Sequence, residues 1–247
     1  MLRIDHLSKQ YPGGAKAVDD LTLHVEPGDL YGFIGHNGAG KTTTLKCAAG
    51  ILSFESGSVQ INGTALASDP VACKLVTAYI PDQPEIYPHL TGWQYLSFIT
   101  NIYQLDHSAE DTATQYAALF EILDDLPSQI SSYSHGMRQK LALVSAFMRK
   151  PKLFMLDEPF VGLDPRASLE LKRLLTEACS EGAAVLFSTH VLEVAEKMCN
   201  KVAVIKSGRL VASGLTEQVT ASSSLVDVFM ELNADRDDMR ITPSDEV

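Results

Sequence analysis

Residues 30–43 read LYGFIGHNGAGKTT, and this stretch decides the fold. Leu30 to Ile34 form a short apolar run that is typical of a buried strand. The glycine-rich segment that follows fits the pattern GxxxxGK[ST], and a helical stretch then runs to Gly50. A strand, a glycine loop and a helix in this order predict a loop that binds phosphate groups.

The glycine loop has the chemistry to hold the phosphates of a nucleotide. Glycines let backbone N–H groups converge on phosphate oxygens, and the N-terminus of the following helix adds a favourable dipole. We expect Lys41 to reach the β- and γ-phosphates and the Thr42 hydroxyl to ligate Mg²⁺. A glycine-rich turn with a chance lysine is the alternative, which the flanking strand and helix disfavour. The predicted nucleotide contacts in this loop are Gly35, His36, Asn37, Gly38, Ala39, Gly40, Lys41, Thr42 and Thr43.

Two carboxylates end a second apolar strand. Residues 153–158 read LFMLDE, so Asp157 and Glu158 project at the carboxyl end of the strand, where α/β sheets place ligands. Asp157 suits the shell of a metal ion, and Glu158 is placed to polarise a water for attack on the γ-phosphate. The alternative is an acidic cap on a core strand, which the phosphate loop upstream makes less attractive.

The strand patterns elsewhere predict an α/β fold with a separate antiparallel β patch. Residues 2–11 and 21–25 alternate like half-buried strands, and residues 56–64 add a hairpin that turns at an Asn-Gly pair. Short apolar strands at 153–156 and 183–188 flank a helical segment, which predicts a βαβ crossover and a parallel sheet.

A mostly helical insert is predicted over about residues 92–149. Apolar residues recur there at intervals of three and four, in the segments 95–105, 116–126 and 136–150. A last hairpin turns at Ser207-Gly208, and the chain becomes polar and acidic beyond Leu232. We therefore expect one domain over residues 2–232 and a flexible acidic tail over residues 233–247.

Composition and charge narrow the possible partners. The chain has 247 residues, 45% of them apolar, and a formal net charge of −11. A nucleic-acid partner is not expected, since no run of Lys and Arg offers a footprint for a phosphate backbone. The four cysteines show no CxxC spacing, which indicates a reduced, cytoplasmic setting without a zinc site or disulfides. No signal peptide is expected, and the apolar stretches are shorter than the roughly 20 residues that cross a bilayer.

Together these motifs resemble the ATP-binding cassette (ABC) family, from about Leu2 to about Leu232. The resemblance implies a P-loop NTPase core with an antiparallel β subdomain and an inserted α-helical subdomain. It also implies that Tyr11 stacks on adenine and that His190 is the catalytic histidine that senses the γ-phosphate. Residues 162–164 resemble the D-loop, which contacts the opposite subunit in the family.

Residues 134–137 resemble the family's signature sequence, usually LSGGQ. In the family this motif binds the γ-phosphate that the other subunit holds, which assigns Ser134 and Gly136 to nucleotide binding. An ordinary helix N-cap is the alternative. Tyr133, His135 and Met137 replace the usual Leu, Gly and Gln, a variant similar to that of small bacterial exporters of drugs and antimicrobial peptides. His135 is either tolerated or adds a titratable group beside the γ-phosphate.

A second departure lies in the segment IPDQP, residues 80–84. The family usually has a glutamine directly after the first proline, reaching toward Mg²⁺ and the attacking water, and here Asp82 holds that place and Gln83 follows. We assign Asp82 to the metal together with Thr42 and Asp157. Gln83 is the alternative at this position.

The resemblance also implies cofactors and partners. ATP and Mg²⁺ are expected, with a second copy of the chain or a related cassette and a membrane-spanning permease subunit, at the cytoplasmic face of the cell membrane. The family docks a helix of the membrane subunit on residues 82–95, where Ile86 and Tyr87 look exposed and Trp93 fits a surface or a core position equally well. The motif variants and the lack of a C-terminal regulatory domain favour export. The alternatives are a soluble ABC ATPase in translation or DNA repair, and a module that holds ATP without turnover.

Overall fold

The structure, a computed structural model, describes residues 1–106, 108–220 and 223–234. Within them the strands are β1 (Leu2–Gln10), β2 (Lys16–Val25), β3 (Leu30–Ile34), β4 (Ser56–Ile61), β5 (Thr64–Ala65), β6 (Thr77–Ile80), β7 (Leu153–Asp157), β8 (Ala184–Thr189), β9 (Lys201–Lys206) and β10 (Arg209–Leu215). The α-helices are α1 (Lys41–Ala48), α2 (Pro70–Leu75), α3 (Gly92–Ile102), α4 (Ser108–Leu119), α5 (His135–Phe147), α6 (Pro165–Ser180), α7 (Leu192–Met198), α8 (Thr216–Thr220) and α9 (Leu225–Ala234), and none of these described helices is long and apolar enough to cross a membrane.

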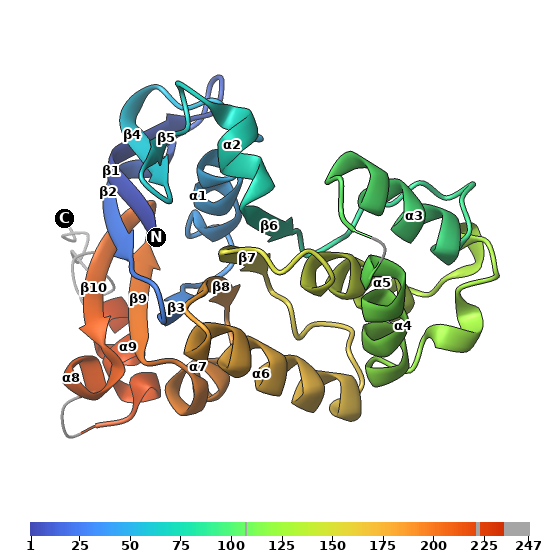
Figure 1. The fold of residues 1–247 in the computed structure, drawn as a ribbon. Helices are drawn as coiled ribbons and strands as arrows, with labels where there is room; N and C mark the ends of the chain where they lie inside the picture. The colour runs from blue at the N-terminus through green and yellow to red at the C-terminus, as the bar shows by residue number, and fades with distance from the viewer. Residues whose placement is uncertain (107, 221–222, 235–247) are drawn as a thin grey trace, which may run out of the picture.

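A central sheet with the strand order β10-β9-β3-β8-β7-β6 forms the core of the fold (Figure 1). All neighbouring strands in it are parallel except β10, which returns antiparallel to β9. Both faces are buried, since Leu153 and Met155 pack into one hydrophobic cluster while Phe154 and Leu156 pack into the other. The predicted parallel sheet is confirmed, and the carboxyl ends of β3, β6, β7 and β8 meet at one edge.

The predicted antiparallel β patch is a sheet of order β2-β1-β4-β5, which packs with α1 over one face of the central sheet (Figure 1). Its β4–β5 turn is the Asn-Gly pair that the sequence indicates. Asn62 and Gly63 have φ of 49° and 80°, the left-handed pair that a two-residue hairpin turn requires.

The helical lobe contains α3, α4 and α5, and it differs from the predicted segments in one place. The segment 116–126 is not one helix, because α4 begins at Ser108 and ends at Leu119, and a 3₁₀ turn over Leu123–Asp125 follows. The buried face of α4 is made of Ala109, Ala113 and Ala117. These small side chains give a weak hydrophobic pattern, whereas the bulkier residues after Leu119 dominate the apolar pattern of the segment 116–126.

The connection between the two sheets contains α2 and β6, and neither element was predicted from the sequence. Asp69 caps α2 by accepting from the backbone N–H of Ala72 at 2.9 Å, with Pro70 as the first helical residue. This signature was present in the sequence. At the other end, α9 runs to Ala234, so the predicted tail begins inside a helix, and its remainder, residues 235–247, lies outside the described residues.

Candidate functional site

A cleft of about 380 Å³ lies where the carboxyl ends of β3, β6 and β7 meet. It brings together residues that are far apart in the sequence, and all of them except Ala17 were predicted to touch nucleotide, metal or water. The lining residues are Tyr11, Ala17, His36, Asn37, Gly38, Gly40, Lys41, Thr42, Thr43, Asp82 and Glu158.

The glycine loop between β3 and α1 packs closely against backbone atoms of other segments. Gly38 and Gly40 have φ of 80° and 109°, a region that L side chains rarely adopt. A Cβ on Gly40 would overlap the carbonyl oxygen of Ala17, and one on Gly35 would lie 2.7 Å from the carbonyl oxygen of Ile205. Glycine is required at Gly35 and Gly40 because other parts of the backbone pack directly against the loop.

Lys41 places its ammonium group inside the loop. Its Nζ donates to the carbonyl oxygens of Gly35 at 2.6 Å and His36 at 3.3 Å, and it lies 3.6 Å from Oε1 of Glu158. The side chain is only 7% exposed, so the charge is held at the floor of the cleft rather than in solvent. A buried ammonium with carbonyl partners and one carboxylate suits the binding of a polyanion.

The two carboxylates at the carboxyl end of β7, Asp157 and Glu158, lie beside the end of β8. Asp157 is buried and accepts from the Ser188 hydroxyl at 2.5 Å, while the backbone N–H of Glu158 donates to the same hydroxyl at 2.9 Å. His190 Nδ1 lies 2.9 Å from Oε2 of Glu158. Glu158 has φ of 49°, an uncommon conformation for a non-glycine residue that is typical of functional sites.

Ser188 is a site residue that the sequence analysis missed. It pairs with Asp157 across β7 and β8, so the register of the two strands brings its hydroxyl to the carboxylate. The available indication in the sequence was a serine directly after the apolar run 183–187, and the structure buries it fully.

Ser188→Ala is expected to destabilise the fold by about 1–3 kcal/mol, because it leaves a buried carboxylate oxygen without its donor. It is also expected to slow phosphate release, since Glu158 loses a backbone anchor. Denaturant unfolding and a phosphate-release assay measure the two effects. Ser180→Ala, at the exposed end of α6, is the matched control and should change the free energy of unfolding by less than about 0.5 kcal/mol. Wild-type behaviour of Ser188→Ala in both assays would remove it from the site.

Asp82 reaches the cleft and Gln83 does not line it. The register pairs Ile80 with Leu156, so the residues that follow β6 and β7 leave the sheet side by side. Asp82 lines the cleft with Glu158, whereas Gln83 is exposed. This geometry favours Asp82 over Gln83 as the group that faces the phosphate loop.

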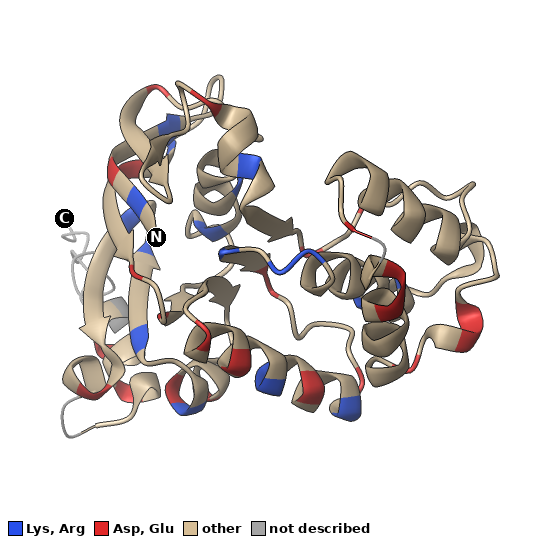
Figure 2. Cartoon of the chain, viewed as in Figure 1, with Lys and Arg blue, Asp and Glu red and all other residues tan. Residues whose placement is uncertain are grey.

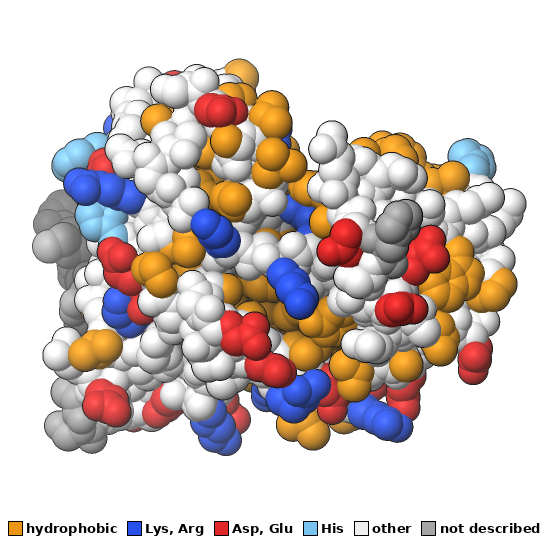
Figure 3. All heavy atoms as spheres, in the orientation of Figure 1, with side chains coloured by type: hydrophobic (Ala, Val, Ile, Leu, Met, Phe, Trp, Pro, Cys, Tyr) orange, Lys and Arg blue, Asp and Glu red, His pale blue; other side chains and the backbone are white. Residues whose placement is uncertain are grey.

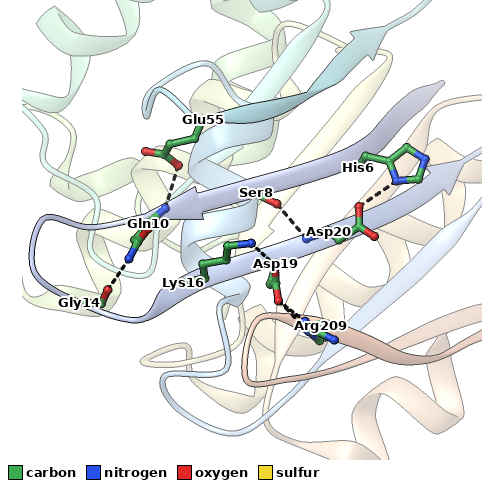
Figure 4. A network of polar contacts seen from close by, with 9 residues as sticks. All are labelled: His6, Ser8, Gln10, Gly14, Lys16, Asp19, Asp20, Glu55 and Arg209. Carbon is green, nitrogen blue, oxygen red and sulfur yellow. Dashed lines mark hydrogen bonds and ion pairs between the residues drawn. The ribbon is translucent and has the colours of Figure 1, made fainter.

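Tyr11 lies at the rim of the cleft, on the loop between β1 and β2. Its ring is 43% exposed, and its hydroxyl lies 3.4 Å from that of Thr43. Figure 4 shows how the preceding residue is fixed: the Gln10 backbone N–H donates to Glu55 and its side chain donates to the carbonyl of Gly14, both at 2.8 Å. The exposed ring is therefore carried on an anchored backbone.

The turn between β9 and β10 joins this rim to the phosphate loop. The N–H of Gly208 donates to the Ala39 carbonyl at 2.8 Å, and the N–H of Asp19 donates to the Gly208 carbonyl at 2.9 Å. The Asp19 carboxylate accepts from Lys16 and Arg209 (Figure 4). The hairpin was predicted from the sequence, whereas its contact with the phosphate loop was not.

Ser134 caps α5, with its Oγ accepting from the N–H of Met137 at 3.2 Å. Neither Ser134 nor Gly136 lines the cleft, so one copy of the chain does not bring them to its own phosphate loop. Gly136 instead packs on residue 162, since a Cβ there would lie 2.5 Å from the Gly162 carbonyl oxygen. The segments 134–137 and 162–164 therefore form one contiguous surface.

An ion pair strengthens this contact between α5 and the start of α6. Lys140 Nζ lies 2.6 Å from Asp164, which also caps α6 by accepting from the N–H of Ala167 at 2.9 Å. The N–H of Ala167 and the Lys140 ammonium lower the pKa of the Asp164 carboxyl. Asp164 is thus held as a carboxylate.

Comparison with known proteins gives the same assignment. The family model described as ABC transporter matches residues 18–161. The ABC-type transporter ATP-binding protein EcsA of Bacillus subtilis is 33% identical over 219 residues, which cover 86% of this chain and 89% of EcsA. The solved structure of an ATP-binding subunit of an ABC transporter has a TM-score of 0.90 and 33% identity over 94% of this chain and 99% of its own.

The chain belongs to the ABC transporter family. It is an ATP-binding subunit of that family and an ATPase. A dimeric ATP-binding cassette solved in a post-hydrolysis state with ADP and Pi shares the fold, with a TM-score of 0.79 at 20% identity over 87% of this chain and 99% of that chain. The P-loop NTPase core and the two subdomains predicted from the sequence are confirmed.

The segment 134–137, which resembles the family's signature sequence, has the bulky His135 where glycine is usual, and a glycine opposite makes room for it. The His135 ring packs against Gly162, where a Cβ would lie 2.5 Å from Cδ2 of the ring. Gly162 also has φ of 79°. The histidine thus contacts Gly162 of its own copy, which favours tolerance of His135 at this position.

Proposed function

We propose that this ABC ATPase works as a pair of cassettes that closes on ATP and Mg²⁺ and drives export through a separate membrane-spanning subunit. One observation carries the pairing: neither Ser134 nor Gly136, at the N-terminus of α5, lines the phosphate cleft of its own copy. A signature segment from a second copy, or from a related cassette, is needed to cover the γ-phosphate. The two copies would therefore pair head to tail.

The cleft residues divide into two roles toward the nucleotide. Residues 35–43 hold the phosphates, with Lys41 as the point charge and the helix N-terminus of α1 behind it. Tyr11 offers its exposed ring to the adenine. In the paired state Ser134 and Gly136 of the other copy contact the far end of the triphosphate.

The oxygen ligands in the cleft fit Mg²⁺. Thr42 and Asp82 line the cleft, and the buried Asp157 directly precedes Glu158, which also lines it. Their hydroxyl and carboxylates are the hard donors that this ion prefers. Among the described residues no group of three or more His, Cys, Asp or Glu side chains gathers into a cage for a metal ion. This fits Mg²⁺, which is commonly held by one or two carboxylates together with the phosphates of its substrate.

Hydrolysis is assigned to Glu158 and His190. Glu158 lies 3.6 Å from the Lys41 ammonium and 2.9 Å from the His190 ring, so its carboxylate is oriented on both sides. It acts as the general base that accepts a proton from the attacking water. His190 orients that carboxylate and senses the γ-phosphate.

The proposal of export is supported by the motif variants at residues 80–84 and 134–137. The proposed attachment to the cytoplasmic face of a membrane follows from membership of the ABC transporter family. The segment 82–95 leads from the cleft into α3, and Tyr87 and Trp93 in it are 58% and 36% exposed. The partner expected there is a helix of the membrane subunit, packed in an apolar groove. A soluble role in translation or DNA repair is the second candidate, which the net charge of −11 disfavours because nucleic acid attracts basic surfaces.

Co-purification tests the transporter role. The tagged chain, isolated from detergent-solubilised membranes of its own host, is expected to retain an integral membrane protein, and ATP turnover is expected to change when that protein is present. Glu158→Gln, which holds the paired state, should increase the yield of the complex. Recovery with ribosomes or DNA and no membrane protein would support the second candidate instead.

A further inference from the structure

Backbone atoms from two separate elements enclose the glycine loop that precedes α1. On one side, a Cβ on Gly40 would overlap the Ala17 carbonyl oxygen of β2. On the other side, the N–H of Gly208 in the β9–β10 turn donates to the Ala39 carbonyl at 2.8 Å. These two walls also touch each other, since a Cβ on Gly208 would lie 2.9 Å from the Ala17 carbonyl oxygen. The shape of the loop therefore depends on how closely β2 and the turn are held together.

A bulged stretch of β2 turns its backbone toward this turn. The register with β1 shifts between Leu7 and Gln10, which leaves β2 with extra residues over 16–21. Extra residues bend a strand and free backbone groups from the ladder. Here the N–H of Asp19 donates to the Gly208 carbonyl at 2.9 Å. The bulged stretch thus joins the antiparallel β unit to the turn beside the phosphate loop.

The Asp19 side chain closes the same junction from outside the cleft. Its carboxylate accepts from Lys16 at 2.6 Å and from Nε of Arg209, the residue after Gly208, at 2.7 Å (Figure 4). The Lys16 ammonium and the Arg209 guanidinium lower the pKa of the Asp19 carboxyl, which is therefore ionised at neutral pH. Asp19 does not line the nucleotide cleft, so it acts on a nucleotide only through the backbone that it holds.

The other charged side chains of β1 and β2 pair within the antiparallel β unit. Figure 2 shows charges of both signs on these strands, and in Figure 3 acidic, basic and histidine side chains gather on the same side of the molecule. Among the described residues, the pair of Asp19 with Arg209 is the one ion pair of β1 and β2 that reaches the central sheet. The pairs that stay within the unit are Arg3–Asp5, His24–Asp5, His6–Asp20, Lys9–Glu55 and Lys16–Asp19.

We propose that Asp19 is a positioning residue for ATP binding, which holds the β9–β10 turn against the phosphate loop so that the N–H groups of the loop stay aimed at the phosphates. The inference rests on the proposed function, because it takes residues 35–43 as the loop that holds the phosphates. Without the carboxylate, the positive charges of Lys16 and Arg209 are left close together and repel each other. The turn then loses its tether to β2, and the loop loses one of its two walls.

The expected loss falls on the affinity for ATP and not on the chemical step. Lys41 and Glu158 make their contacts on the far side of the loop from Asp19 and keep them when the carboxylate is removed. An ion pair that only stabilises the fold makes a different prediction: its removal lowers the melting temperature and leaves the KM for ATP unchanged.

The test compares Asp19→Asn with Asp20→Asn, the same change in the next residue, whose carboxylate lies 2.8 Å from the His6 ring and does not pair with the turn. Asp19→Asn is expected to raise the KM for ATP about three- to tenfold and to leave kcat within about twofold. Arg209→Gln removes the other half of the pair and should give the same rise, and the double variant should add little to either. Asp20→Asn should keep the wild-type KM and kcat.

A Tyr11→Ala background distinguishes the phosphate loop from the rim of the cleft. Lys16, the second partner of Asp19, follows the loop that carries Tyr11, so the carboxylate could act on the adenine contact instead. If Asp19 positions the phosphate loop, Asp19→Asn raises the KM by the same factor with and without the Tyr11 ring. A rise that disappears in Tyr11→Ala overturns the proposal.

Thermal unfolding checks that each variant is folded. An unchanged KM in folded Asp19→Asn overturns the positioning role, and so does an equal rise in Asp20→Asn. Lys41→Ala, measured alongside, separates this failure from a failure of the proposed function. Weaker ATP binding in Lys41→Ala together with a wild-type KM in Asp19→Asn overturns only the positioning role, whereas wild-type behaviour of both variants overturns the phosphate loop as well.

Discussion

Glu158→Gln is expected to lower phosphate release by about two to four orders of magnitude while ATP still binds. The amide keeps the shape of the side chain but cannot accept the proton of the attacking water. Binding is retained because Lys41 and the glycine loop remain intact. With ATP bound and not hydrolysed, the chain should accumulate as a stable pair of cassettes. A phosphate-release assay measures turnover, equilibrium nucleotide binding measures ATP affinity, and light scattering measures the pairing of the cassettes.

Glu181→Gln provides the matched control for this prediction. It removes the same charge from an exposed residue just after α6, away from the cleft, and should leave turnover unchanged. Wild-type phosphate release in Glu158→Gln would take the general-base role away from Glu158. A loss of turnover with no ATP-dependent pair would keep that role and contradict the paired mechanism.

Lys41→Ala is expected to weaken ATP binding by about 10- to 100-fold, because a buried charge-assisted contact to the phosphates is lost. The structure gives this residue a direct place in the loop, with its Nζ 2.6 Å from the Gly35 carbonyl oxygen. Turnover should fall as well, since the ammonium also faces Glu158. Equilibrium binding of a fluorescent ATP analogue measures the affinity.

Lys46→Ala is the control for the same helix. Lys46 lies in the last turn of α1 and does not line the nucleotide cleft, so its loss removes the same charge without touching the phosphate site. An unaltered ATP affinity in folded Lys41→Ala would contradict the assignment of the loop as the phosphate cradle.

The central part of the fold and the cleft could be predicted because local sequence fixes them. The bounds of β3 agree with the predicted strand, residue for residue, and the glycine loop needs its own backbone conformation whatever surrounds it. The carboxyl end of β7 is similarly a local property. The conformation of these motifs is determined by their own residues, so they could be predicted from the sequence alone.

The features that were not predicted from the sequence depend on contacts between segments that are distant along the chain. Ser188 matters only because β8 lies beside β7, and Gly208 only because a hairpin turn packs on the phosphate loop. The span of α4 follows from alanines that pack closely, a weak pattern in the sequence.

The fit between Gly136 and Gly162, reinforced by Lys140 and Asp164, has a mechanical consequence. The segments 134–137 and 162–164, which would meet the neighbouring cassette, are expected to move as one rigid unit. The two glycines bring their backbones into direct contact, and the ion pair joins the helices that follow. A displacement of the N-terminus of α5 would therefore move the N-terminus of α6 as well. Rotation of the helical lobe would then move both contact segments together, so the two nucleotide sites of a pair would be coupled.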